Sequence, residues 1–166
     1  MKVYDSYTQE LRDFVPLEGN KVKMYVCGPT VYDYPHLGHA RCYITWDMVV
    51  KYLRFRGYDV VYARNITDVD DKIINKAKEQ NKTTDEIAST YYALFKEAMH
   101  KLNVADPDIE PKATENIPEM IDMVQTLIDK DYAYVVDGDV YFRVKKFQKY
   151  GKLSKQSISE LEAGAR

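Results

Sequence analysis

Residues 27–41 read CGPTVYDYPHLGHAR, and this run joins an apolar segment to an amphipathic one. Residues 22–26, just before it, carry lysine among apolar side chains and predict a β-strand. Gly28-Pro29 interrupts that strand, because glycine and proline are the strongest breakers of regular structure. Pro35 suits the first position of a helix, where its missing N–H costs no hydrogen bond. The run therefore predicts a strand that turns directly into a helix.

The helix expected after this turn leads to a second strand. Gly57 is expected to end the helix in the left-handed conformation, and residues 59–63 read as the strand. Strand, helix and strand at this spacing form a βαβ unit, in which the two strands run parallel. The apolar positions that recur at helical spacing are Leu37, Ala40, Ile44, Met48 and Tyr52.

Three further helices are expected, over about 70–80, 84–102 and 117–130. Pro107 and Pro111 mark a linker between the second and the third. The architecture is therefore expected to change near the linker, where a βα half gives way to a helix and an antiparallel ribbon.

The ribbon is indicated by Asp137-Gly138, which lies between β-rich runs at 132–136 and 140–144. Asp-Gly in this setting predicts a two-residue hairpin. Residues 143–155 carry six cations and no acid. This charge run is either a solvated surface or a contact for a phosphate backbone.

The bulk composition excludes several classes of protein. The 166 residues suit one domain, or one domain with a subdomain, and a net charge of -2 gives no general nucleic-acid footprint. The two cysteines, Cys27 and Cys42, are too few for a disulfide scaffold. No signal segment opens the sequence, and no apolar run approaches the ~20 residues of a membrane span. We expect a cytoplasmic protein with reduced thiols and no membrane contact.

The predicted βα turn is where an α/β protein binds a phosphate group, because free N–H groups and the helix dipole meet there. His36 and His39 are three residues apart and share one helix face. Both can donate an N–H to phosphate oxygens and stabilise charge that develops on a nucleotide's α-phosphate. Gly38 lets a flat ligand or a phosphate approach the backbone. The remaining histidine, His100, is expected on a helix surface.

Three carboxylates lie close together after the second strand, at Asp68, Asp70 and Asp71. They suggest either a metal site or a helix cap with solvated neighbours. We favour the cap, because aspartate is a preferred residue just before a helix.

Residues 36–39, HLGH, resemble the nucleotide-binding motif of the class I aminoacyl-tRNA synthetases. Longer strings resemble one family within that class, the cysteinyl-tRNA synthetases: MYVCGPTVYD at 24–33, HLGHAR at 36–41 and NITDVDDKII at 65–74. The resemblance covers essentially the whole chain. Its weaker strings lie at 113–115, 150–154 and 163–166.

The resemblance implies an α/β fold in two parts. Residues 1–110 would be the first half of a Rossmann-like, class I nucleotide-binding domain, and residues 111–166 the start of an inserted α+β connective subdomain. It also implies a monomeric ligase that activates L-cysteine to cysteinyl adenylate, with ATP and magnesium, and transfers it to tRNA(Cys).

The same resemblance implies roles for individual side chains. His36 and His39 are the implied catalytic residues. The implied ATP contacts are Pro29, Thr30, His36, Gly38 and His39. The implied amino-acid contacts are Cys27, Gly28, Thr30, Asn65 and Thr67. Cys42 is either a neighbour of that pocket or a buried helix thiol, and Arg41 is a further candidate for an ATP or tRNA contact.

Cys27 is also implied as a zinc ligand, with the zinc holding the thiolate of the substrate. Shape alone discriminates poorly between serine and cysteine, whereas a soft metal prefers the thiolate. One cysteine cannot hold zinc. The family's remaining ligands, a cysteine, a histidine and a glutamate, have no matching segment in this sequence.

The family's mobile Lys-Met-Ser-Lys-Ser loop has no match either, because the nearest string, at 153–157, lacks the first lysine and the methionine. We therefore expect an N-terminal fragment that forms no cysteinyl adenylate by itself. One alternative is a cysteine:sugar ligase of thiol biosynthesis, which uses the same adenylate chemistry. Another is a non-catalytic zinc-binding module built on Cys27, His36 and His39.

Overall fold

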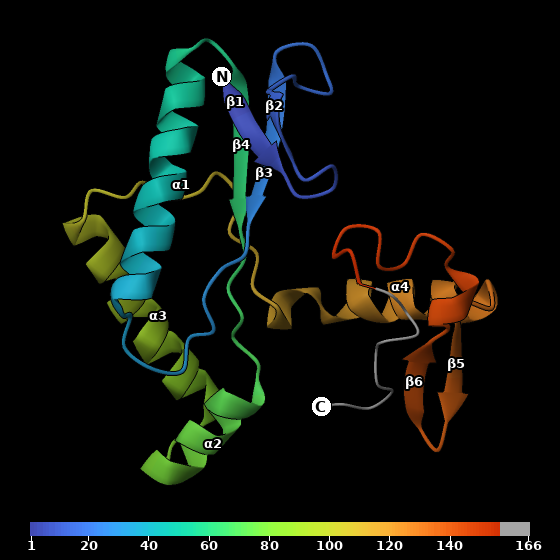
Figure 1. Cartoon of the computed structure of the whole chain (residues 1–166). Coiled ribbons are helices and arrows are strands. Elements are labelled where there is room, and N and C mark those ends of the chain that lie inside the picture. The colour runs from blue at the N-terminus through green and yellow to red at the C-terminus, as the bar shows by residue number, and fades with distance from the viewer. Residues whose placement is uncertain (157–166) are drawn as a thin grey trace. The chain divides into compact units, whose positions relative to one another are not determined.

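Two parallel strands and the helix between them form the centre of the fold (Figure 1). In this computed structural model, β3 (Lys21–Val26) is followed by α1 (Leu37–Phe55) and β4 (Asp59–Arg64). The strands pair in parallel, with Lys21 opposite Asp59, and the register continues without interruption along both strands. The predicted βαβ unit is confirmed.

The structure describes residues 1–156, which form two compact units. One unit comprises residues 16–117, and the other comprises residues 1–15 with the chain from Pro118 onward. The sequence-based division between residues 110 and 111 stays a prediction.

Helix α1 begins two residues after Pro35, so the prediction that Pro35 is its first residue is wrong. The N-terminal cap is His36, whose imidazole accepts the main-chain N–H of Gly38. The helix closes at Arg56, and Gly57 follows with φ of +86°, as expected for a left-handed C-terminal residue.

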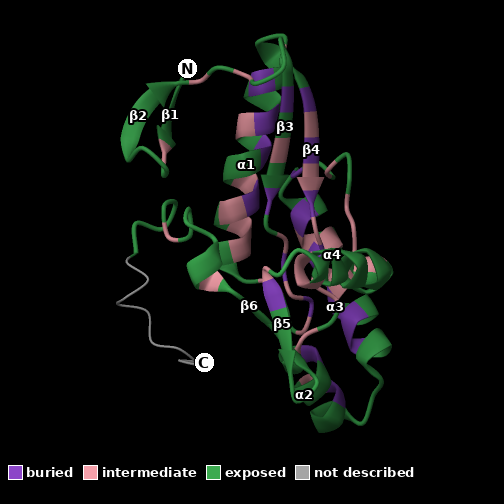
Figure 2. Ribbon diagram, turned by 90° about the vertical axis from the view of Figure 1, so that its right-hand side faces the viewer, coloured by how far each residue is buried: buried purple, intermediate pink, exposed green. Residues whose placement is uncertain are grey.

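The side of α1 that is buried differs from the one that the apolar spacing marks (Figure 2). Leu37 and Met48, two of the recurring apolar residues, are 84% and 64% exposed. The buried side chains are Tyr43, Asp47, Val50 and Leu53. An aspartate is tolerated there because its carboxylate accepts the Ala105 N–H (3.1 Å) and pairs with Lys51 (2.6 Å).

Two further helices, α2 (Asp71–Gln80) and α3 (Thr84–Lys101), pack against each other. The Asp70 carboxylate accepts a main-chain N–H of the first turn of α2, which confirms its role as a cap. Thr83 caps α3 in the same way and forms a capping box with Glu86. None of the described helices is both long enough and apolar enough to cross a bilayer.

The segment after α3 covers the outer edge of β4. The main-chain N–H groups of Arg64 and Ile66 donate to the carbonyls of Ile109 (3.0 Å) and Pro111 (2.8 Å), and a parallel bridge joins Ala63 to Ile109. The sequence predicts only a linker here, because two prolines interrupt it. β3 has no strand partner on its other edge in the part of the chain that the structure describes.

The other unit holds a helix and two antiparallel hairpins. β1 (Lys2–Asp5) pairs with β2 (Glu10–Asp13). α4 (Ile117–Asp129) follows a single 3-10 turn at Thr114–Asn116 and leads to the second hairpin. That hairpin pairs β5 (Ala133–Val136) with β6 (Asp139–Phe142), and a 3-10 turn at Val144–Lys146 follows it.

The second hairpin is predicted from its turn, and the first is not. Asp137 and Gly138 both have positive φ, +50° and +91°, as an Asp-Gly hairpin turn requires. The turn of the first hairpin contains no glycine. It is held instead by Asp5, whose carboxylate accepts the N–H of Tyr7 (2.9 Å).

The basic run after the second hairpin is partly paired. Arg143 and Lys146 both contact the carboxylate of Asp131, at 3.1 and 2.8 Å. The weaker family string at residues 163–166 lies outside the described residues, as does the last residue of the 153–157 string.

Candidate functional site

The predicted site residues come from three places that the βαβ unit brings to one edge of the sheet. Cys27 follows β3 and Asn65 follows β4, and the N-terminus of α1 lies across the same edge. We name this edge of the sheet the crevice, after the place where α/β folds bind ligands, and call His36, Gly38 and His39 its histidine end. The cysteine end comprises Cys27, Gly28, Asn65 and Thr67.

The two histidines of the histidine end cap the helix for each other. His36 Nδ1 accepts the Gly38 N–H at 3.0 Å, and His39 Nδ1 accepts the His36 N–H at 3.1 Å. Their rings are stacked, with centroids 4.0 Å apart. Because each Nδ1 is an acceptor, each neutral ring carries its proton on Nε2. One N–H on each ring is therefore left to donate.

Gly38 is required by this arrangement. A Cβ at Gly38 would lie 2.8 Å from Cε1 and 2.9 Å from Nδ1 of His36. The glycine thus admits the ring of His36 onto the end of the helix, a reason that the sequence does not reveal. Burial and the neighbouring charge of His36 lower the pKa of His39, which favours its neutral form.

The loop after Cys27 is fastened to the chain after β4. The Thr67 N–H donates to the carbonyl of Pro29 (3.0 Å), and the Val31 N–H donates to the carbonyl of Thr67 (3.2 Å). Thr30 and Thr67 form a parallel bridge between these bonds. The implied ATP and amino-acid contacts of the loop therefore lie directly beside Thr67.

Helix α2 holds the same loop from the other side. Lys76 pairs with the carboxylate of Asp33 at 2.9 Å, and the ammonium of Lys72 lies 5.2 Å from the ring centroid of Tyr32. The hydrogen bond from Lys76 is the main cause of the lowered pKa of Asp33. Asp68 serves a structural role as well, because its carboxylate accepts the N–H and hydroxyl of Thr114.

The side chain of Asn65 makes three hydrogen bonds within the protein. Its Oδ1 accepts the Gly28 N–H at 2.7 Å and the Tyr25 hydroxyl at 2.8 Å. Its Nδ2 donates to Thr67 Oγ1 at 3.3 Å. Asn65 therefore ties the two strand ends together.

Cys27 is exposed at the cysteine end, and its Sγ lies 3.8 Å from the carbonyl oxygen of Gly28. Within residues 1–156, no three His, Cys, Asp or Glu side chains gather into a group that could hold a metal ion. His36 and His39 also use their Nδ1 atoms for capping. The described residues therefore supply one thiolate and do not by themselves fit a zinc ion, and the structure gives no support to a zinc module of Cys27, His36 and His39.

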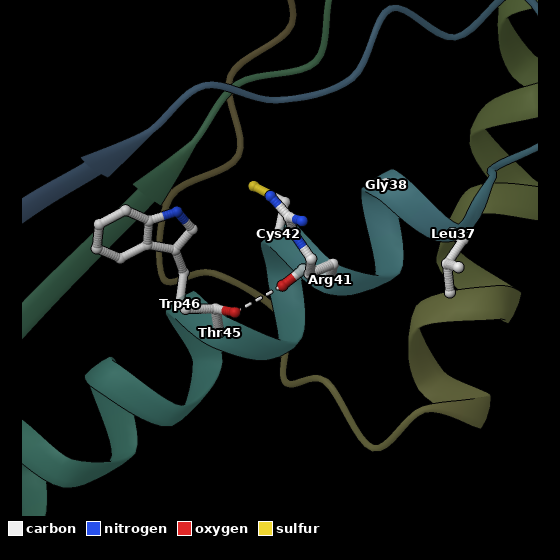
Figure 3. Close-up of a pocket in the computed structure, with 6 residues that line it drawn as sticks. All are labelled: Leu37, Gly38, Arg41, Cys42, Thr45 and Trp46. Carbon is white, nitrogen blue, oxygen red and sulfur yellow. Dashed lines mark hydrogen bonds between the residues drawn. The ribbon is translucent and has the colours of Figure 1, made fainter.

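A cavity of about 500 Å³ lies along α1, beside the histidine end (Figure 3). Gly38 lines it near one end and Trp46 at the other, with the half-buried thiol of Cys42 between them. Arg41 also lines it, and no hydrogen bond or ion pair of its guanidinium is found among the described residues. Trp46 is the one lining aromatic ring, and the sequence offers no motif that marks it.

Sequence reasoning also misses a buried charge network beneath the crevice. Arg64 is fully buried and donates to Glu110 at 2.6 Å. Its guanidinium lies 5.0 Å from the ring of Tyr43 and 5.1 Å from that of Phe95. Tyr92 also donates to Glu110, at 2.6 Å. These residues are too far apart in sequence for any local pattern to connect them.

The network keeps Glu110 ionised. Burial alone would raise its pKa, but the hydrogen bonds from Tyr92 and Arg64 outweigh burial and leave the pKa below its usual value. Burial and the bond to Glu110 raise the pKa of Tyr92 to about 12, so its hydroxyl remains a donor. The carboxylate is thus a fixed counter-charge for Arg64.

Comparison with solved structures supports the fold. The chain superposes on an Agrobacterium radiobacter K84 LeuRS, crystallised with tRNA and LeuAMS, with a TM-score of 0.61 over 68% of this chain and 15% of that one, at 19% identity. It superposes on Mycobacterium tuberculosis methionyl-tRNA synthetase, in complex with methionyl-adenylate, with a TM-score of 0.57 over 74% of this chain and 28% of that one, at 17% identity. The predicted α/β class and partial Rossmann-like fold are confirmed.

Curated relatives match at higher identity. A cysteine–tRNA ligase of Maridesulfovibrio salexigens is 53% identical over 100% of this chain and 34% of its own length. One of Geobacillus thermodenitrificans is 53% identical over 100% of this chain and 36% of its own length. The chain thus spans about a third of the length of these relatives. The family model for the class I (C) tRNA synthetase catalytic domain matches residues 13–166, and the chain belongs to this family.

Proposed function

We propose that this chain is the N-terminal part of a cysteine–tRNA ligase, which activates L-cysteine with ATP and transfers it to tRNA(Cys). The observation that carries the proposal is the 53% identity to cysteine–tRNA ligases along the whole of this chain. The geometry agrees with it, because two histidines at a helix N-terminus and an exposed thiol lie at one edge of the same sheet.

In this proposal the histidine end acts on ATP, which enters as its magnesium complex. The carboxylate of cysteine attacks the α-phosphorus, the bond to the β-phosphate oxygen breaks, and pyrophosphate leaves. The Nε2–H groups of His36 and His39 would donate to the α-phosphate oxygens as negative charge builds up on them. Mutual capping fixes both rings before ATP arrives, so little reorganisation is needed.

The cysteine end would receive the amino acid. The exposed thiol of Cys27, the backbone of Gly28 and the hydroxyls of Thr30 and Thr67 are the candidate contacts. In the longer protein, Cys27 is proposed to be one of several zinc ligands, and the others lie outside the described residues. Cys27 alone does not make a zinc site, so the described residues cannot hold the metal by themselves.

The proposal is tested by cysteine-dependent exchange between ATP and pyrophosphate, measured on the full-length protein that contains this chain. His39→Ala is expected to lower the exchange rate by about 10²-fold or more, as when a transition-state donor is removed. His100→Ala is the matched control, because the imidazole of His100 is exposed and pairs with Asp106, away from the histidine end. Exchange driven by another amino acid in preference to cysteine, or unaffected by His39→Ala, would overturn the proposal.

The 166-residue chain itself is expected to give no useful exchange. Its sequence has no match to the lysine-rich pyrophosphate loop of the family or to the family's remaining zinc ligands. Exchange at a rate near that of the full-length protein would show that this part alone is sufficient.

A further inference from the structure

The peptide group between Cys27 and Gly28 is held at both of its ends by side chains from elsewhere in the fold. Its carbonyl oxygen accepts the hydroxyl of Tyr43 at 3.2 Å, and its N–H donates to Asn65 Oδ1 at 2.7 Å. The carbonyl and the N–H of one peptide lie in one plane and point in opposite directions. Two hydrogen bonds at opposite ends therefore fix the rotation of that plane.

The side chain of Tyr43, which holds the carbonyl end of this peptide, is rigidly packed. Tyr43 is 3% exposed, and its ring meets Phe95 edge-on, with centroids 5.4 Å apart. The buried guanidinium of Arg64 lies 5.0 Å from the same ring. Burial raises the pKa of Tyr43, so the hydroxyl stays protonated and able to donate to the Cys27 carbonyl.

The Asn65 side is equally constrained. The Tyr25 hydroxyl and the Gly28 N–H both donate to Oδ1, and Nδ2 donates to Thr67, so the amide has one orientation that satisfies all three partners. Gly28 also lies directly against the backbone here, since a Cβ on it would be 1.4 Å from the carbonyl oxygen of Asn65. The two strand ends leave no space for this peptide to rotate.

We propose that Tyr43 and Asn65 are positioning residues that clamp the peptide between Cys27 and Gly28 and so set the direction of the Cys27 thiol. Fixing the peptide fixes ψ of Cys27, while pairing of β3 with β4 fixes the chain just before it. The sequence resemblance implies that Asn65 contacts the substrate directly. In the role proposed here, Asn65 instead orients Cys27 and Thr67, which are themselves candidate contacts of the amino acid. The inference rests on the proposed function only in taking Cys27 to face the amino acid.

Three variants separate the clamp from general stability. Asn65→Ala removes the acceptor for the Gly28 N–H, whereas Asn65→Asp keeps that acceptor, replaces the donor to Thr67 with a second oxygen that can accept from the Thr67 hydroxyl, and adds a negative charge. Tyr43→Phe removes the hydroxyl and keeps the buried ring. Tyr91→Phe is the matched control, since Tyr91 is also a buried tyrosine, but its hydroxyl contacts Gln80.

The direct readout is amide hydrogen exchange at Gly28, measured by NMR relative to the amides of β4. Asn65→Ala is expected to speed exchange at Gly28 by about 10-fold, which is the loss of one hydrogen bond. Tyr43→Phe should give a smaller acceleration, and Asn65→Asp should restore the original rate. An equal change in the exchange rates of all core amides, or no change in the rate at Gly28, would contradict the proposed positioning role.

The functional readout uses exchange of pyrophosphate into ATP by the full-length protein. Asn65→Ala and Tyr43→Phe are expected to raise KM for cysteine by about 10-fold, because a displaced thiol misplaces the amino acid, and to leave KM for ATP within about 2-fold. Equal changes in both KM values would contradict the positioning role. If the unsubstituted protein gave no cysteine-dependent exchange of pyrophosphate into ATP, the proposed function would fail. Amide hydrogen exchange at Gly28 would still show whether Tyr43 and Asn65 hold the peptide.

Discussion

The histidine end of the crevice is built from neighbours in sequence, whereas the cysteine end is assembled from residues far apart along the chain. His36, Gly38 and His39 lie within one turn, and their mutual capping needs nothing else. Cys27 depends on Tyr43 and Asn65 for its backbone. The comparison shows that a short segment can fix two histidine rings by itself, while the backbone of Cys27 is held by several parts of the fold.

The largest loss of stability is expected from breaking the pair of Arg64 and Glu110, which lies beneath both the histidine end and the cysteine end. Arg64 lies beneath Tyr43, whose ring is parallel to that of His39 and whose hydroxyl holds the Cys27 carbonyl. Glu110→Gln leaves Arg64 buried without its counter-charge. We expect a loss of about 3 kcal/mol or more in the free energy of unfolding, measured by urea denaturation.

The control for this change is Glu97→Gln. Glu97 pairs with Lys101 on the exposed surface of α3, where solvent screens the pair, so the loss of unfolding free energy should be far smaller than for Glu110→Gln. Similar losses for the two variants would show that the pair of Arg64 and Glu110 is not a structural support of the crevice.

The next largest effect is a difference in stability cost between a substitution at the cysteine end and one at the histidine end. A Cβ at Gly28 would meet the backbone of Asn65 at 1.4 Å, whereas a Cβ at Gly38 would meet only a side chain, the ring of His36, at 2.8 Å. Gly28→Ala is therefore expected to cost about 3 kcal/mol of unfolding free energy, as for overpacking against fixed atoms. Gly38→Ala should cost about 1 kcal/mol, the value of a lost N-terminal cap.

Both losses are measured by urea denaturation of the same chain. Equal costs, or a greater cost at Gly38, would contradict the view that the cysteine end is fixed by backbone and the histidine end by side chains.

The sequence predicts the features that depend on neighbouring residues and misses those that depend on residues far apart in the chain. The βαβ unit, the cap at Asp70 and the Asp-Gly hairpin are predictable because each depends on a local pattern. The pairing of residues after α3 with β4 is not, because two prolines hide the extended segment. The face of α1 is misjudged since a buried aspartate, Asp47, lies on it.

The site divides in this way as well. The sequence predicts a site at His36, Gly38 and His39 from their spacing and position at a βα turn. It does not reveal Tyr43, Arg64 or Glu110, whose contacts arise only when α1, β4 and the segment after α3 come together.

The smallest expected effect is a pH dependence of the unfolding free energy, which arises from His39 at the histidine end. His39 has a pKa below 6.5 in the folded protein, so the unfolded chain binds more protons as the pH falls. The stability contribution of the neutral ring is present above pH 6.5 and is lost as the pH drops below it. We expect a fall in unfolding free energy between pH 7.5 and 5, measured by urea denaturation at each pH.

His39→Gln is the variant that tests this dependence. Glutamine at the third helical position can still accept the His36 N–H, so the capping box is kept while the titrating group is removed. The slope between pH 7.5 and 5 should become shallower. An unchanged slope would assign the dependence to other groups.

The most direct test of the difference between the two ends is zinc content, measured by elemental analysis of this chain and of the full-length protein. We expect zinc well below one equivalent in the 166-residue chain. We expect one equivalent in the full-length protein, lost in Cys27→Ala and retained in His36→Ala. Stoichiometric zinc in the 166-residue chain that disappears in both variants would contradict the proposed roles, because the histidine end would then be a metal site and not a nucleotide cradle.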